Sequence, residues 1–155
     1  MKNLKDLRIG YTPYSSDQKA PGDRRRFCWY ADKRDMRFEI PTPSEEYDLI
    51  VLNLSCDLSV WKKYQGKAKI VFELIDSYLD ISRTDIKGLL RGVAKFAFRQ
   101  SRYLCLNHWE TLQKMCQKAD AVICSTEEQR QKILSFCDNV HIILDIQSSV
   151  TRKVK

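Results

Sequence analysis

Short runs of apolar residues alternate along this chain with segments in which apolar positions recur at helical spacing. Three of the runs are nearly all apolar, as expected for strands that are covered on both faces: DLIVLNL (48–54), AKIVFEL (68–74) and ADAVICS (119–125). Three shorter strands are predicted at residues 7–11, 37–40 and 139–144.

The segments between these runs predict helices at residues 23–33, 57–64, 84–118 and 126–136. Asp23 is the predicted N-cap of the first helix, and Ser125 or Thr126 that of the last. Strands that alternate with helices predict an α/β fold, a parallel sheet of about six strands with helices on both faces. Ligands of such sheets bind beyond the carboxyl ends of the strands.

The length of 155 residues suits one domain, which we place at residues 1–146, followed by a basic tail at 147–155. No apolar run reaches the roughly 18 residues of a membrane span, and the N-terminus lacks an apolar signal region. These features predict a cytoplasmic protein. Six cysteines without a CxxC pair predict reduced, buried thiols, and the spacing of Cys105, His108 and Cys116 matches no zinc template. We therefore expect neither a metal nor a cofactor.

The formal net charge is +7, which suits nucleic acid, an anionic membrane surface or phosphorylated small molecules as partners. No nucleic-acid recognition motif is visible, so nucleic acid is not the expected partner. Four basic residues recur at every fourth position of the predicted long helix: Lys87, Arg91, Lys95 and Arg99. This stripe suits peripheral contact with an anionic membrane, and a solvated polar face is the alternative interpretation.

The loop that follows the first predicted strand is a candidate binding segment, because it is long and lies at the ligand-binding edge. It has neither the dinucleotide-binding GxGxxG pattern nor a P-loop. Its candidate residues are Tyr11, Tyr14, Gly22, Arg24, Arg25 and Arg26. Cations oppose the positive end of a helix dipole, so the three arginines at a predicted helix start either face solvent or bind an anion such as phosphate.

Two further groups of polar residues follow predicted strands. In IDSYLD (75–80), Asp76 and Asp80 suit a general base, a ligand for a sugar hydroxyl or a metal pair, and equally helix capping and turn formation. Tyr78 suits stacking on a sugar or base, or ordinary packing. Ser125 and Thr126 suit capping of the last helix or binding of an anion there.

The order of these pieces resembles a known family. ADAVICSTEEQRQKIL followed by NVHIILD looks like the end of the N-terminal domain of GT-B glycosyltransferases, especially the retaining, family-four-like group. That family usually has a proline-asparagine-glycine turn where Asp145, Ile146 and Gln147 stand here. RIGYTPYSS and PGDRRRF occupy the place of its first strand, glycine-rich loop and first helix, with the paired glycines reduced to Gly22. The resemblance covers residues 7–145.

The resemblance implies a Rossmann-like, acceptor-side domain that faces a second, nucleotide-sugar-binding domain across a cleft. A sugar would be transferred to an acceptor near the 11–26 loop, Asp76, Tyr78 and Asp80, with the three arginines on phosphate groups. The catalytic residue is not identified, and Asp76 is the candidate. Without a C-terminal domain the chain would have little or no activity. A non-enzymatic interaction or regulatory domain and a basic nucleic-acid-binding domain remain the alternatives.

Overall fold

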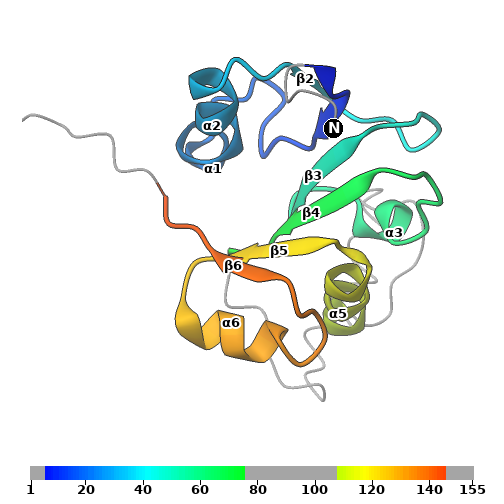
Figure 1. Ribbon diagram of the computed structural model, residues 1–155, viewed down its shortest axis with the longest axis vertical. Helices are drawn as coiled ribbons and strands as arrows, with labels where there is room; N and C mark the ends of the chain where they lie inside the picture. Colours follow the sequence, from blue (N-terminus) through cyan, green and yellow to red (C-terminus); the bar gives the residue numbers. More distant parts are fainter. Residues whose placement is uncertain (1–5, 76–107, 146–155) are drawn as a thin grey trace, which may run out of the picture.

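The protein folds around one six-stranded sheet, which the computed structural model describes through residues 6–75 and 108–145 (Figure 1). The strand order is β2-β1-β3-β4-β5-β6, and all neighbouring strands are parallel. The strands are β1 (Ile9–Tyr11), β2 (Phe38–Glu39), β3 (Leu49–Asn53), β4 (Lys69–Glu73), β5 (Ala121–Cys124) and β6 (Val140–Ile142). The predicted α/β class with a parallel sheet is therefore confirmed.

The central strands β3 and β4 show why the apolar runs are unbroken. They pair over five residues, from Leu49 beside Lys69 to Asn53 beside Glu73. Successive side chains point to opposite faces, and both faces of β3 are covered. Ile50 and Leu52 belong to the larger core cluster, whereas Val51 belongs to the smaller one. A strand with one exposed face alternates apolar and polar residues. Because both faces of β3 are buried, this alternation is absent and the run is apolar.

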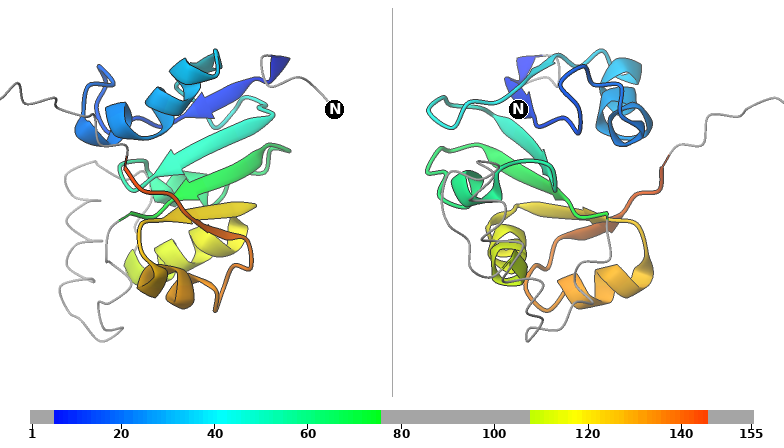
Figure 2. Two further views of the ribbon diagram at one scale, coloured as in Figure 1. Left: turned by 60° about the vertical axis from the view of Figure 1, so that its left-hand side comes forward. Right: turned by 180° about the vertical axis from the view of Figure 1, so that it is seen from behind.

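Helices lie on both faces of this sheet (Figure 2). The described helices are α1 (Pro21–Arg25), α2 (Phe27–Lys33), α3 (Leu58–Trp61), α5 (His108–Lys118) and α6 (Glu127–Ile133). Phe27 and Ala31 of α2 pack in the smaller cluster with β1 and β3. Trp61 of α3, Leu112 of α5 and Ile133 of α6 share the larger cluster. Each cluster is the core between the sheet and one helical layer.

The first helical segment differs from its prediction. A single helix was expected at residues 23–33, but α1 and α2 are separated at Arg26, whose φ of −125° and ψ of −118° are not helical. The prediction of Asp23 as an N-cap is wrong, because α1 begins at Pro21 and Asp23 lies within its first turn. Arg24 and Arg25 lie in the last turn of α1, where the helix dipole favours cations.

The last helix agrees with its prediction at its start. Thr126 is the N-cap of α6, and its hydroxyl accepts a hydrogen bond from the Gln129 N–H at 3.2 Å. The Thr126 N–H in turn donates to the Gln129 side-chain oxygen at 3.2 Å, which completes a capping box. Of the long helix predicted at 84–118, only α5 lies within the described residues. In the part of the chain that is described, no helix combines the length and apolarity needed to cross a membrane.

Candidate functional site

The carboxyl edge of the sheet is the place to look for a site, because ligands of open α/β sheets bind there, beside the point where the strand order reverses. Here the reversal lies between β1 and β3, which are neighbours with connections that leave in opposite directions. The segments that follow Tyr11, Asn53, Glu73, Cys124 and Ile142 all meet at this edge. These segments form the carboxyl edge of a Rossmann-like α/β sheet.

At the reversal point the polar groups satisfy one another. The fully buried Asn53 side chain donates to the carbonyl of Thr12, and the Asn53 N–H donates to the Thr12 hydroxyl at 3.2 Å. The Ser55 hydroxyl donates a hydrogen bond to the Pro13 carbonyl at 2.9 Å. These bonds tie the loop after β1 to the loop after β3. The apolar pattern alone did not single out Asn53, and the available signal was an amide in an apolar strand, which needs a buried hydrogen-bond partner.

The buried carboxylate of Asp23 organises the loop after β1. It accepts hydrogen bonds from the Tyr11 hydroxyl at 2.7 Å, the Tyr14 N–H at 2.8 Å and the Ser15 N–H at 3.1 Å. Both Asp23 and Tyr11 have no exposed surface. A Cβ at Gly22 would lie 2.7 Å from Cδ2 of Tyr14, so glycine is needed there for close approach of the ring. Asp23 therefore anchors the loop internally, and Tyr11 serves as a core residue that supports it.

The three arginines have different surroundings. Arg24 and Arg25 are exposed, and the Arg24 Nε donates to the Lys19 carbonyl at 2.9 Å. Arg26 is 1% exposed. Its Nε lies 2.6 Å from Asp145 Oδ1, and its Nη2 donates to the Ser125 hydroxyl at 3.1 Å. The three arginines therefore differ in role: Arg24 and Arg25 face solvent beside the loop, and Arg26 forms ion pairs with carboxylates.

Arg26 gathers groups from three separate parts of the chain. Besides Asp145 and Ser125, its Nη2 donates to the Ile143 carbonyl at 3.0 Å, and its Nη1 lies 3.9 Å from Glu73 Oε1. Among the described residues, Arg26 Nη1 and Glu73 Oε2 are buried without a hydrogen-bond partner. A buried guanidinium is costly unless it is paired, and Arg26 makes these contacts from the non-helical position between α1 and α2.

Glu73, the last residue of β4, is the second buried charge of this cluster. Its relative exposure is 4%. Burial raises its pKa to about 7, Arg26 opposes the rise, and Asp145 and Asp23 add to it. A strongly perturbed carboxyl group at the ligand-binding edge is a recognised sign of a functional position. The signal in the sequence was the single acid in AKIVFEL, which reasoning from the apolar pattern alone passed over.

The remaining predicted site residues divide into two groups. Ser125 and Thr126 lie at the edge, where Ser125 contacts Arg26 and the Thr126 hydroxyl caps α6. Seven predicted residues lie outside the described part of the chain: Asp76, Tyr78, Asp80, Lys87, Arg91, Lys95 and Arg99. The described chain after β4 ends at Ile75, whose carbonyl accepts a hydrogen bond from the Gln129 side chain at 3.3 Å at this same edge.

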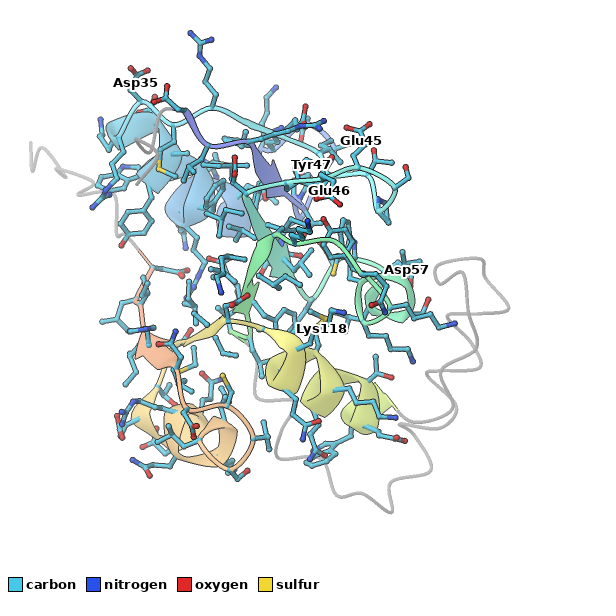
Figure 3. All side chains as sticks on the ribbon, turned by 45° about the vertical axis from the view of Figure 1, so that its right-hand side comes forward. Asp35, Glu45, Glu46, Tyr47, Asp57 and Lys118 are labelled. Carbon is cyan, nitrogen blue, oxygen red and sulfur yellow. The ribbon has the colours of Figure 1, made fainter. Side chains whose placement is uncertain are left out.

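The opposite, amino-terminal edge carries a second group of charges. Figure 3 shows Glu45, Glu46 and Tyr47 together on the segment before β3. The Arg8 guanidinium lies 4.7 Å from the centre of the Tyr47 ring and pairs with Glu39 and Glu45. Arg8 is about half exposed, and exposed ion pairs contribute roughly 0–1 kcal/mol each. This group ties β1 and β2 to the 45–47 segment and is not a candidate site.

Metal-binding and disulfide chemistry find no support in the described residues. No group of three or more histidine, cysteine, aspartate or glutamate side chains there is arranged to hold a metal ion. The described cysteines that are free thiols are Cys28, Cys56, Cys116, Cys124 and Cys137. Comparisons with protein-family models, with curated proteins and with solved structures each returned no match.

Proposed function

We propose that this chain is the acceptor-side domain of a GT-B glycosyltransferase, which moves a sugar from a nucleotide-sugar donor to an acceptor when a donor-binding domain completes the cleft. The observation that carries the proposal is the buried pair of Arg26 and Glu73, joined by the exposed Asp145, at the carboxyl edge of a parallel sheet. Charges in such a position cost stability and are typical of functional sites. The resemblance of ADAVICSTEEQRQKIL and NVHIILD to the family supports the same assignment.

The residues of this edge would have different roles in the transferase. Arg24 and Arg25 are exposed beside the loop after β1, so they are the arginines free to contact phosphate of a donor or acceptor. Arg26 holds the edge together through its carboxylate partners. The loop anchored by Asp23, together with Asp76, Tyr78 and Asp80, would hold the acceptor sugar. No metal takes part in this scheme.

Ligand-induced changes in amide NMR signals of the ¹⁵N-labelled chain test this proposal. The probes are UDP-glucose, UDP and a panel of neutral mono- and disaccharides, at matched ionic strength. We expect a subset of the sugars to shift amides in residues 12–16 and 125–127. Arg25→Ala should weaken the effect of UDP-containing probes, whereas Lys67→Ala, an exposed control before β4 at the opposite edge, should not. Shifts in neither segment with any probe would contradict the proposal.

A protein-interaction domain is the second candidate function, and one observation favours it. Ile142 of the outermost strand β6 is 40% exposed and Leu144 is 68% exposed. Apolar side chains on an edge strand suit contact with another protein surface. Ile142→Lys combined with Leu144→Lys should abolish any concentration-dependent association seen by sedimentation velocity, and association that survives this change would count against β6 as the contact.

A further inference from the structure

The guanidinium of Arg26 lies between two carboxylates that differ in their access to water. On one side its Nε contacts Asp145 at 2.6 Å, and its Nη2 holds the Ile143 carbonyl. On the other side its Nη1 faces Glu73 at 3.9 Å, which is too long for a hydrogen bond. Arg26 therefore forms a hydrogen-bonded ion pair with Asp145, whereas its ion pair with Glu73 has no hydrogen bond.

We propose that Arg26, Glu73 and Asp145 form a proton-controlled latch, in which the charge on Glu73 decides how firmly Arg26 holds the chain that leaves the sheet after β6. This inference goes beyond the proposed transferase function and does not depend on it. It concerns how the segment from Ile143 to Asp145 is attached to the domain.

The groups that face Glu73 decide the direction of the response. They are Arg26 between α1 and α2, Asp145 after β6, Asp23 of α1, Tyr11 of β1 and Cys28 of α2. Three of these positions, counted with Glu73 itself, are carboxyl groups around a single guanidinium. The cluster is thus short of positive charge whenever Glu73 is ionised. A proton on Glu73 removes one negative charge from it.

Glu73 is the member of this set that changes its charge near neutral pH. Burial raises the pKa of the Tyr11 hydroxyl, whose hydrogen bond goes to Asp23, far above neutrality. Burial also raises the pKa of the Cys28 thiol to about 11, so both groups stay neutral. Burial raises the pKa of Glu73 to about 7, so this carboxyl group gains or loses its charge in the neutral range.

The difference in exposure to water decides which of the two carboxylates, Glu73 or Asp145, moves away from Arg26. The Glu73 side chain is only 5% exposed, whereas the Asp145 side chain is 45% exposed. When Glu73 ionises, it attracts the guanidinium and repels Asp145. Asp145 can move into water at little cost, because a half-exposed carboxylate is already partly hydrated. The latch is therefore closed when Glu73 is protonated and loosened when Glu73 is charged.

Hydrogen–deuterium exchange of the backbone reports this directly. The Ile143 N–H donates to the Cys124 carbonyl at 3.0 Å, so its protection follows the attachment of the segment. After correction for intrinsic exchange, we expect protection of Ile143 to fall by about tenfold, the factor of one pKa unit, between mildly acidic and mildly alkaline pH. The Phe72 amide in the sheet centre reports the pH dependence of global stability, and the latch is measured as the fall at Ile143 in excess of the fall at Phe72.

Two variants and one control separate the latch from general pH effects. Glu73→Gln should keep Ile143 protected over the whole pH range, and Asp145→Asn should leave it weakly protected throughout. Glu127→Gln, which removes an exposed carboxylate from α6, should behave like the parent chain. A pH-independent protection of Ile143 in the parent, or an unchanged pH dependence in Glu73→Gln, would overturn the proposal.

A direct titration keeps the proposal testable if Glu73→Gln does not fold. The side-chain carboxyl carbons of Glu73 and Asp145 in the ¹³C-labelled parent chain can be followed by NMR. The latch requires the Asp145 signal to shift at the pH where Glu73 titrates. Titration of Glu73 without any response of Asp145 would show that the two carboxylates do not compete for Arg26.

Discussion

Removal of the Asp23 carboxylate should cost more than a typical single substitution, and the contacts of this side chain give the magnitude. Asp23→Ala leaves the buried Tyr11 hydroxyl and the Tyr14 N–H without their acceptor. Each buried donor left unsatisfied costs about 1–3 kcal/mol. The Ser15 donors are half-buried and can turn to water. Loss of one negative charge near Glu73 offsets part of this cost. We expect a net loss of about 3 kcal/mol in the free energy of unfolding.

Urea denaturation followed by tryptophan fluorescence measures this loss. Tyr11→Phe, which removes the donor and keeps the ring, should cost only about 0.5–1.5 kcal/mol. In the double variant the two effects should not add, because Tyr11 and Asp23 share one hydrogen bond. A loss below about 1 kcal/mol for Asp23→Ala, or strict additivity in the double variant, would refute the assignment of Asp23 as the loop anchor.

Three further outcomes follow from other contacts. Phe72→Ala, which empties a fully buried position in β4, should lower the free energy of unfolding by about 3–5 kcal/mol in the same urea assay, and a smaller loss would mean that the core can collapse around the gap. Thr126→Ala should cost about 0.5–2 kcal/mol by removing the capping box of α6, with Thr126→Ser retaining most of the stability. Because burial raises the pKa of Glu73 from 4.5 to about 7, the folded chain binds one proton more than the unfolded chain between those values. Its stability should therefore fall by about 3 kcal/mol as pH rises through that interval, relative to Glu73→Gln in parallel melts, and equal slopes for the two proteins would contradict this.

Local patterns predicted the parts of the fold that local forces decide. The run DLIVLNL contains β3 within one residue at each end, because two-sided burial demands an unbroken apolar run. The cap at Thr126 was one of two candidates, and its Gln129 partner lies only three residues away. Such features depend on neighbours in sequence and can be read from it.

The candidate site was less predictable, because long-range contacts decide it. Asp23 was interpreted as a cap from its neighbours, but its principal partner is Tyr11 on the adjacent strand. Arg26 was grouped with two exposed arginines, since nothing near it in sequence reveals carboxylates at positions 73 and 145. The start of α1 at Pro21 is a different case. Proline is favoured at the first helical position, so a local signal was present, but the helix was predicted to begin at Asp23.

The distances along the chain that Arg26 spans have a consequence for synthesis on the ribosome. Its contacts with Ser125, Ile143 and Asp145 join residues that are 99, 117 and 119 positions apart. At a translation rate of about 5–20 residues per second, Arg26 waits on the order of ten seconds for its last partner to be made. During that interval the acceptors Ser125, Ile143 and Asp145 are not yet all present. If α1 and α2 packed on β1 and β3 at this stage, the Arg26 guanidinium would be buried without them. The N-terminal part of the sheet is therefore expected to complete its packing late, after β6 has left the ribosome.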